Sequence, residues 1–248
     1  MKPNSISSSG RETSGEGEPK DARVDRAAHA DRPLLLTVGH STHTFPSFLE
    51  LLRGQGVTAV ADVRSQPFSR RAPQFNREVL AASLKEAGLH YVFLGEELGA
   101  RRVEPECYEG GQVSFRRVVA LPRFQEGLAR LRQGLRRFRI ALLCAEREPL
   151  DCHRTLLVCR ELRGEMRIAH ILADGTVEEQ AATEQRLARQ MQVAPSLFEP
   201  SLDAEEMTVQ AYDRRAKQIA YRRPPAPVAL EPSSADLGTC DPGADLES

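Results

Sequence analysis

Apolar and polar positions alternate in blocks along the central part of the chain, roughly residues 32–222. Short apolar runs of strand length are followed by polar turn residues, and most turns lead into a segment with the 3.6-residue period of an amphipathic helix. Five such runs predict strands, at Leu34–Val38, Val57–Val63, His90–Leu94, Arg139–Cys144 and Arg167–Leu172.

Capping residues delimit the helices between these strands. Ser, Thr, Asp and Asn satisfy the free backbone N–H groups at a helix start, and Gly commonly follows a helix end. The expected N-caps are Thr44, Asn76 and Asp151, for helices of about 45–52, 77–89 and 152–163, and two further helices are expected at about 121–136 and 176–191.

This alternation of strands and helices predicts an α/β fold with a doubly wound, mainly parallel sheet of about five strands, flanked by helices in a Rossmann-like, three-layer arrangement. We expect one domain over residues 32–222, between disordered tails at 1–31 and 223–248. Residues 195–206 read as a linker, and 208–222 as a basic helix. That helix is expected to pack on the body; contact with another subunit or with nucleic acid is the alternative.

Composition narrows the class of protein. The 248 residues carry a formal net charge of -1, which argues against global wrapping by nucleic acid but leaves a local basic patch open. No apolar stretch approaches the length of a membrane span. The 5 cysteines form no CxxC pair or disulfide framework, and the acidic residues of the first 31 positions do not suit a transit peptide. A cytoplasmic protein is therefore expected.

Reactive side chains follow the expected strands directly, at Gly39-His40-Ser41-Thr42, Arg64-Ser65, Gly95–Arg102 and Cys144-Ala145-Glu146. Parallel sheets bind ligands at the carboxyl ends of their strands, so these segments predict one polar pocket at one edge of the sheet. Basic residues in neighbouring loops, Arg70, Arg71, Arg101, Arg102, Arg116 and Arg117, either surround that pocket or are solvated surface.

Several separated motifs resemble the domain-of-unknown-function 488 family. The resemblance implies an α/β fold and no established activity. The resemblance covers about Leu34 to Leu172 and continues into 211–215 and 219–222. The motifs that carry it are Val38–Thr42, Asp62–Pro67, Pro73–Asn76, Leu143–Glu146 and Cys152-His153-Arg154.

The segment Asp151-Cys152-His153-Arg154 is the strongest candidate for anion binding. If Asp151 is the N-cap, the next three residues occupy the first helical turn, where free N–H groups and the helix dipole attract anions and lower a thiol pKa. Arg154 would clamp phosphate or carboxylate, and Cys152 would be a nucleophile. The alternative is a packed thiol, with Arg154 paired to Glu146 or Asp62.

The expected catalytic residues are Glu146, Cys152 and His40. Glu146 would act as general base or bind a ribose hydroxyl, unless it pairs with Arg64 or Arg154. Asp62 and Arg64 share a strand face, so an ion pair competes with ligand binding. The expected substrate- or anion-binding residues are Ser41, Thr42, Arg64, Ser65, Gln74, Asn76, Cys144, His153 and Arg154, although Cys144 is also compatible with an inert buried thiol.

Cofactor signals are weak. Cys144, Cys152, His153 and His40 are metal-ligand types, but the spacing of the two cysteines is not that of a zinc ribbon or finger, so no metal ligands are assigned. The chain has no GxGxxG or Walker loop, and no cofactor is expected.

Three functions follow. The first is a hydrolase or transferase acting on a nucleotide- or nucleic-acid-related phosphate substrate. The second is a non-catalytic nucleotide- or nucleic-acid-binding module, which would have no use for a cysteine and a glutamate beside its anion site. The third is a thiol- or metal-dependent protein.

Overall fold

The computed structural model describes residues 32–193 and 203–224, and its centre is a six-stranded sheet in the order β3-β2-β6-β1-β7-β8. Five strands are parallel, and β8 runs antiparallel at one edge. The mainly parallel α/β fold is thus confirmed, with one strand more than expected. The strands are β1 Leu34–Gly39, β2 Ala59–Asp62, β3 His90–Phe93, β6 Ile140–Cys144, β7 Arg167–Ile171 and β8 Val177–Glu179.

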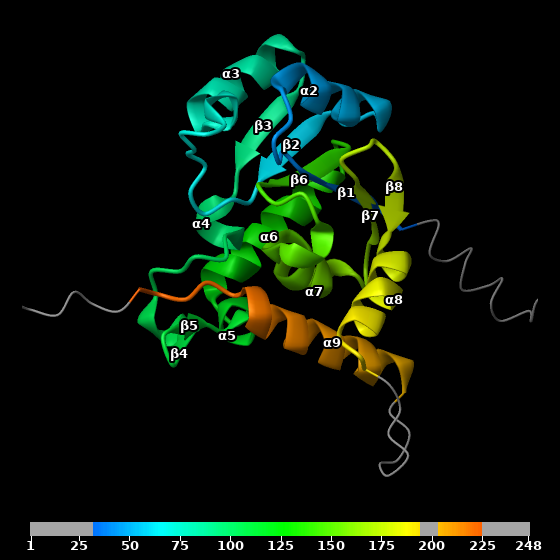
Figure 1. Cartoon of the computed structure of the whole chain (residues 1–248). Coiled ribbons are helices and arrows are strands. Elements are labelled where there is room, and N and C mark those ends of the chain that lie inside the picture. The colour runs from blue at the N-terminus through cyan, green and yellow to red at the C-terminus, as the bar shows by residue number, and fades with distance from the viewer. Residues whose placement is uncertain (1–31, 194–202, 225–248) are drawn as a thin grey trace, which may run out of the picture.

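Helices cover both faces of the sheet (Figure 1). Neighbouring strand residues point to opposite faces, so Leu36 packs with Phe48 and Leu80 beneath α2 and α3, whereas Leu35 belongs to the core that includes Phe124. No helix in the described ranges is long and apolar enough to cross a lipid bilayer. The longer helices are α2 Phe45–Gly54 and α3 Arg77–Glu86 on one face, and α6 Pro122–Leu135, α8 Gln180–Gln190 and α9 Ala204–Ile219 on the other.

Short elements connect these layers. They lie mainly in the segments that follow the parallel strands, and so they shape the carboxyl edge of the sheet. They are η1 Pro73–Phe75, α4 Gly95–Leu98, η2 Pro105–Cys107, α5 Phe115–Val119, η3 Pro149–Asp151, the π-helical η4 Arg154–Cys159, α7 Arg160–Leu162 and the hairpin of β4 Tyr108–Glu109 and β5 Gln112–Val113.

The expected helix 176–191 is wrong in its first turn. Val177–Glu179 forms β8 and pairs with β7 through a tight turn in which Gly175 has a φ of +86°. A positive φ at this position favours glycine and lets the chain reverse. The helix starts only at Gln180.

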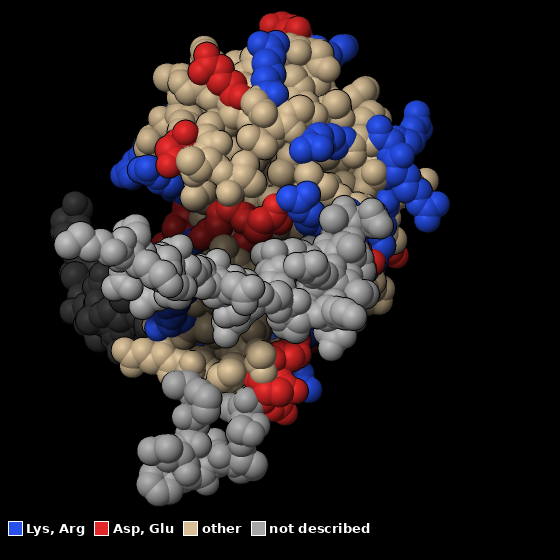
Figure 2. Space-filling view, turned by 90° about the vertical axis from the view of Figure 1, so that its right-hand side faces the viewer, with Lys and Arg blue, Asp and Glu red and all other residues tan. Residues whose placement is uncertain are grey.

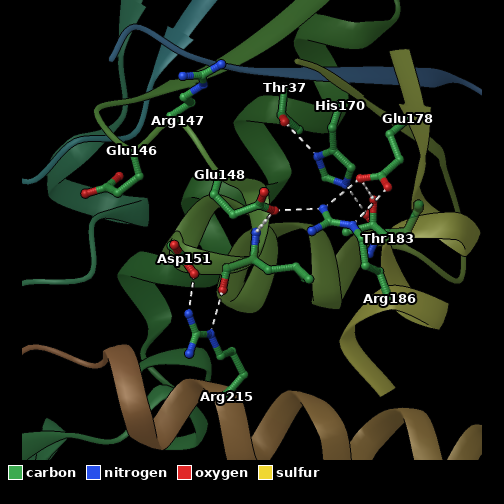
Figure 3. Close-up of polar contacts among 12 residues, drawn as sticks. Thr37, Glu146, Arg147, Glu148, Asp151, His170, Glu178, Thr183, Arg186 and Arg215 are labelled. Carbon is green, nitrogen blue, oxygen red and sulfur yellow. Dashed lines mark hydrogen bonds and ion pairs between the residues drawn. The ribbon is translucent and has the colours of Figure 1, made fainter. Parts of the chain in front are cut away.

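Asp151 does not cap a helix. It ends η3, and its carboxylate pairs with Arg215 of α9, while Glu148 at the other end of η3 binds Arg186 of α8 (Figure 3). Ion pairs with two other helices therefore fix this turn. The residues that follow form a π-helix, so the regular helix expected from 152 is also wrong.

Helix α9 packs on the body, as expected. It begins at Ala204, earlier than predicted, behind a capping box formed by Asp203 and Glu206. Its residues Ala211 and Tyr212 are fully buried in the core shared with α8 and η4. The predicted tail at 1–31 and most of the predicted tail at 223–248 lie outside the described residues, as does most of the predicted linker.

Candidate functional site

A cavity of about 460 Å³ lies at the carboxyl ends of the parallel strands. It brings together residues that follow β1, β2 and β6, as the strand-end pattern predicted. The predicted site residues on its wall are His40, Arg64, Ser65, Cys144, Glu146 and His153, and the wall also includes Gln66, Phe68, Ser69, Arg101, Phe115, Asp151, Ile219 and Tyr221.

The ends of β1 and β6 approach closely because Gly39 has no side chain. A Cβ at this position would collide with the carbonyl oxygen of Glu146. The main chain continues its pairing past the strands, with His40 N–H donating to Cys144 O at 2.9 Å and Ser41 N–H donating to Ala145 O at 3.0 Å. Gly39 therefore lets the Glu146 loop lie against the His40 turn.

Asp62 and Arg64 form an ion pair, which was the alternative to ligand binding by Arg64. The Arg64 guanidinium donates to both carboxylate oxygens of Asp62, at 2.9 and 2.6 Å, and to Phe75 O at 2.9 Å. Tyr91 donates a further hydrogen bond to Asp62 at 2.8 Å. Arg64 is only 5% exposed but still lines the cavity.

Both ring nitrogens of His40 are occupied. Its Nδ1 lies 3.0 Å from Ser41 O, which only accepts, so Nδ1 carries the proton and Nε2 accepts from Arg64 at 3.2 Å. Burial and the Arg64 charge lower the pKa of His40 to about 4. In this arrangement His40 is a neutral support for Arg64, whereas the sequence suggested an acid or base.

Two thiols, a carboxylate and an imidazole meet beside the cavity, and all of them except Cys152 line it. Glu146 Oε2 lies 2.8 Å from Cys144 Sγ and 3.1 Å from Cys152 Sγ. His153 Nδ1 lies 3.5 Å from Cys144 Sγ and 4.0 Å from Cys152 Sγ. Glu146 thus faces the thiols, and neither Arg64 nor Arg154 pairs with its carboxylate in the described part of the chain.

The two thiols have opposite pKa shifts. Burial raises the pKa of Cys144 well above its usual value. Burial also opposes ionisation of Cys152, but the hydrogen bond with Cys144 and the charge of Arg154 outweigh it and hold the pKa of Cys152 well below the usual value. Burial and the neighbouring Cys152 raise the pKa of Glu146. The cluster therefore favours one thiolate next to one thiol.

Arg154 lies beneath this cluster and is fully buried. Its guanidinium donates to Glu146 O at 2.7 Å, to Arg147 O at 3.3 Å and to Thr37 Oγ1 at 3.3 Å. It is not on the cavity wall, so it does not take the position expected for an anion clamp. It fixes the Glu146 loop and places a positive charge near Cys152.

Other predicted residues shape the surrounding loops, away from the cavity wall. Ser41 and Thr42 form the turn after β1, where Ser41 has a φ of 45°. Gln74 donates to His43 O at 3.0 Å. Asn76 begins α3 without a side-chain cap bond, because its Oδ1 accepts from Ser69 N–H at 2.7 Å instead.

Part of the cavity wall comes from residues far apart in the chain. Arg101 donates to Gln66 Oε1 at 2.7 Å, and its guanidinium lies 5.0 Å from the ring centroid of Tyr221, beyond α9. The basic loop 95–102 predicts that Arg101 lies near the cavity. The residues around Tyr221 in the sequence give no such indication. Arg102 and Arg117 instead pair with Glu104 and Glu109.

The fold and this site together define an α/β domain whose reactive side chains gather at the carboxyl edge of a parallel sheet. Residues 44–160 match the family described as Domain of unknown function DUF488, and the chain therefore contains a domain of this family. The match is shorter than the 34–172 expected from the motifs, and it leaves out His40 and α9. Comparisons with curated proteins and with solved structures give no match.

Proposed function

We propose that the protein is a hydrolase or group transferase acting on a small phosphate-containing substrate of the nucleotide class. One observation carries the proposal: a single cavity is lined both by ionisable groups and a thiol and by arginines and aromatic rings. Its volume of about 460 Å³ suits a small metabolite, because pockets for such ligands usually measure about 300–1,000 Å³.

The ionisable side chains of the cavity support proton transfer. Glu146 lines the cavity, and its raised pKa brings the carboxyl group closer to neutral pH, where a general acid or base works best. Cys144 and His153 lie beside it on the same wall. A module that only binds its ligand has no need of this group of residues.

The arginine and aromatic side chains of the cavity support recognition of an anion that carries a ring. Within the described residues, four of the five N–H donors of Arg64 are in use, which leaves one on Nη1. Arg101 is exposed and has spare donors of its own. Phe68, 70% exposed, and Tyr221 offer ring faces to a base. Guanidinium groups next to aromatic faces suit phosphates and planar rings.

Charge favours a small molecule over a long nucleic acid as the partner of this chain. On the one side of the molecule shown in Figure 2, Lys and Arg side chains are scattered and form no continuous basic track. The formal net charge of -1 agrees with this distribution. A nucleic-acid groove would need a continuous basic track.

Turnover tests the proposal. The full chain is incubated with a pool of nucleotides, nucleotide sugars and sugar phosphates, and the pool is followed by mass spectrometry. We expect one class to be consumed by the wild type and by Glu126→Gln, an exposed carboxylate on α6, but not by Glu146→Gln. Binding without consumption would instead identify a binding module. If no compound is bound and none is consumed, both functions are refuted.

A further inference from the structure

We infer that Cys144, Cys152, His153 and Glu146 form a binding site for one divalent transition-metal ion of the zinc type. Their candidate ligand atoms, Sγ, Sγ, Nδ1 and Oε2, all lie within 4.8 Å of one another. The ligands come from two segments, the end of β6 and the residues just before η4, and η3 connects these segments.

The distances suit a tetrahedral ion. For bond lengths of about 2.3 Å to sulfur and about 2.0 Å to nitrogen, a sulfur and a nitrogen ligand lie about 3.5 Å apart. The sulfur–nitrogen distances are 3.5 and 4.0 Å. Glu146 Oε2 lies closer to the sulfurs, at 2.8 and 3.1 Å, so the carboxylate would move outward when the ion enters.

The imidazole of His153 is already oriented for coordination. Its Nε2 lies 2.9 Å from Val63 O at the end of β2. A carbonyl oxygen only accepts, so Nε2 carries the proton and Nδ1 presents its lone pair to the two sulfurs. Ligand histidines usually donate their other N–H to a carbonyl or carboxylate in this way.

The charge of Arg154 supports an anionic cluster. This side chain is fully buried, and in the described ranges it has only neutral oxygen partners. A buried cation is costly unless a negative charge lies nearby. Cys152 can supply that charge as a thiolate, because its Sγ accepts the Arg154 backbone N–H at 3.4 Å. Two thiolates and one carboxylate would be neutralised together by a divalent ion and Arg154.

The donor set selects the class of ion. Thiolate and imidazole ligands favour zinc and its neighbours, whereas magnesium and calcium require oxygen ligands. Glu146 is the exposed member and lines the cavity with Cys144 and His153, so it is the ligand that water or substrate would replace. Only this last role, in catalysis, rests on the proposed function; the metal site itself does not.

Cobalt is the probe for this site. Untagged full-length protein is reduced, stripped with a chelator and titrated with Co²⁺, while Zn²⁺ affinity is measured against a chromophoric chelator. We expect one Co²⁺ per chain, with a thiolate-to-cobalt charge-transfer band and intense tetrahedral visible bands. Cys152→Ser should weaken Zn²⁺ binding by more than about 100-fold, because residues that only orient a ligand by hydrogen bonding already contribute about 10–100-fold to metal affinity.

Two further variants keep the result interpretable. Cys159→Ser changes a buried thiol outside the cluster and should leave the bands intact. Glu146→Gln, at an exposed position, should keep the thiolate band but shift the visible bands, even if Cys152→Ser fails to fold. Absence of a thiolate band in the wild type, or an undiminished band in folded Cys152→Ser, would overturn the metal site. A loaded site without turnover would refute the proposed function alone.

Discussion

Arg154 shows how one side chain determines the position of this site. It lies below the loop that carries Glu146, holds two of its carbonyl oxygens and contributes the charge that favours a Cys152 thiolate. The sequence marked the residue as important but suggested contact with substrate. Sequence position alone cannot distinguish these roles, because both depend on which way the guanidinium points.

Replacing Arg154 by Met should reduce the free energy of unfolding by about 3 kcal/mol, since buried carbonyl and hydroxyl acceptors lose their donor. The neighbouring Arg147 is exposed, and Arg147→Met should change stability by less than about 0.5 kcal/mol. Urea denaturation of both variants measures the difference. Equal stabilities would show that Arg154 does not support the loop.

Gly39 gives a second test at the level of a residue. Gly39→Ala places a Cβ against Glu146 O and should displace the loop, abolishing turnover and reducing stability by about 1–3 kcal/mol. Gly54→Ala is the control, because a Cβ there meets nothing within 4 Å. That change should be neutral or slightly stabilising. Retained turnover in Gly39→Ala would mean that the close approach is not required.

Among the elements, α9 connects the core to the cavity. Tyr212 reaches Glu184 and Gln180 of α8, Gln180 binds His170, and His170 binds Thr37, which accepts from Arg154. Figure 3 shows the middle of this chain, where His170 and Thr37 meet. The end of α9 then supplies Ile219 and Tyr221 to the cavity wall.

Tyr212→Phe should destabilise the protein by about 1–2 kcal/mol, because the buried amide of Gln180 loses an acceptor and Glu184 loses a donor. Tyr221→Phe should leave the free energy of unfolding unchanged, since the Tyr221 hydroxyl has no hydrogen bond within the described residues. Thermal or urea unfolding of the two variants compares them. Equal effects would show that the polar chain adds nothing to the packing of α9.

The parallel strands can be predicted from the sequence, whereas the edge strand and the docking of α9 cannot. Strand runs such as Leu34–Val38 carry enough local signal to predict the parallel sheet, and the carboxyl edge follows from that topology. The edge strand β8 was missed because its first residues also fit a helix. The wall formed by Tyr221 was missed because it depends on where α9 docks, more than 100 residues after β2.

For the whole molecule, two buried neutral histidines make stability depend on pH. Burial and a nearby arginine lower the pKa of His40 and His170 to about 4. Unfolded histidines titrate near 6.5, so the unfolded state takes up more protons than the folded state between these values. The contribution of these two histidines to stability is therefore complete above about pH 6.5 and is lost as the pH drops towards 4.

Between pH 7 and pH 5 each histidine should contribute a loss of about 2 kcal/mol. His170→Gln should remove about half of this histidine-dependent loss, because His40 remains. Urea unfolding at the two pH values gives the free energies, and Arg189→Gln, an exposed position on α8, serves as control. An unchanged pH dependence in His170→Gln would show that His170 is not held neutral.

Ligand binding to the cavity tests the central claim most directly. The melting temperature of the full chain is measured with mono- and diphosphate nucleotides, for the wild type, Arg101→Ala and the exposed control Arg189→Ala. A nucleotide at about 100 times its Kd should raise the melting temperature of the wild type and the control by about 5 °C or more, and should have little effect on Arg101→Ala. No shift with any phosphate compound, or equal shifts in all three proteins, would contradict the assignment of this cavity as a nucleotide site.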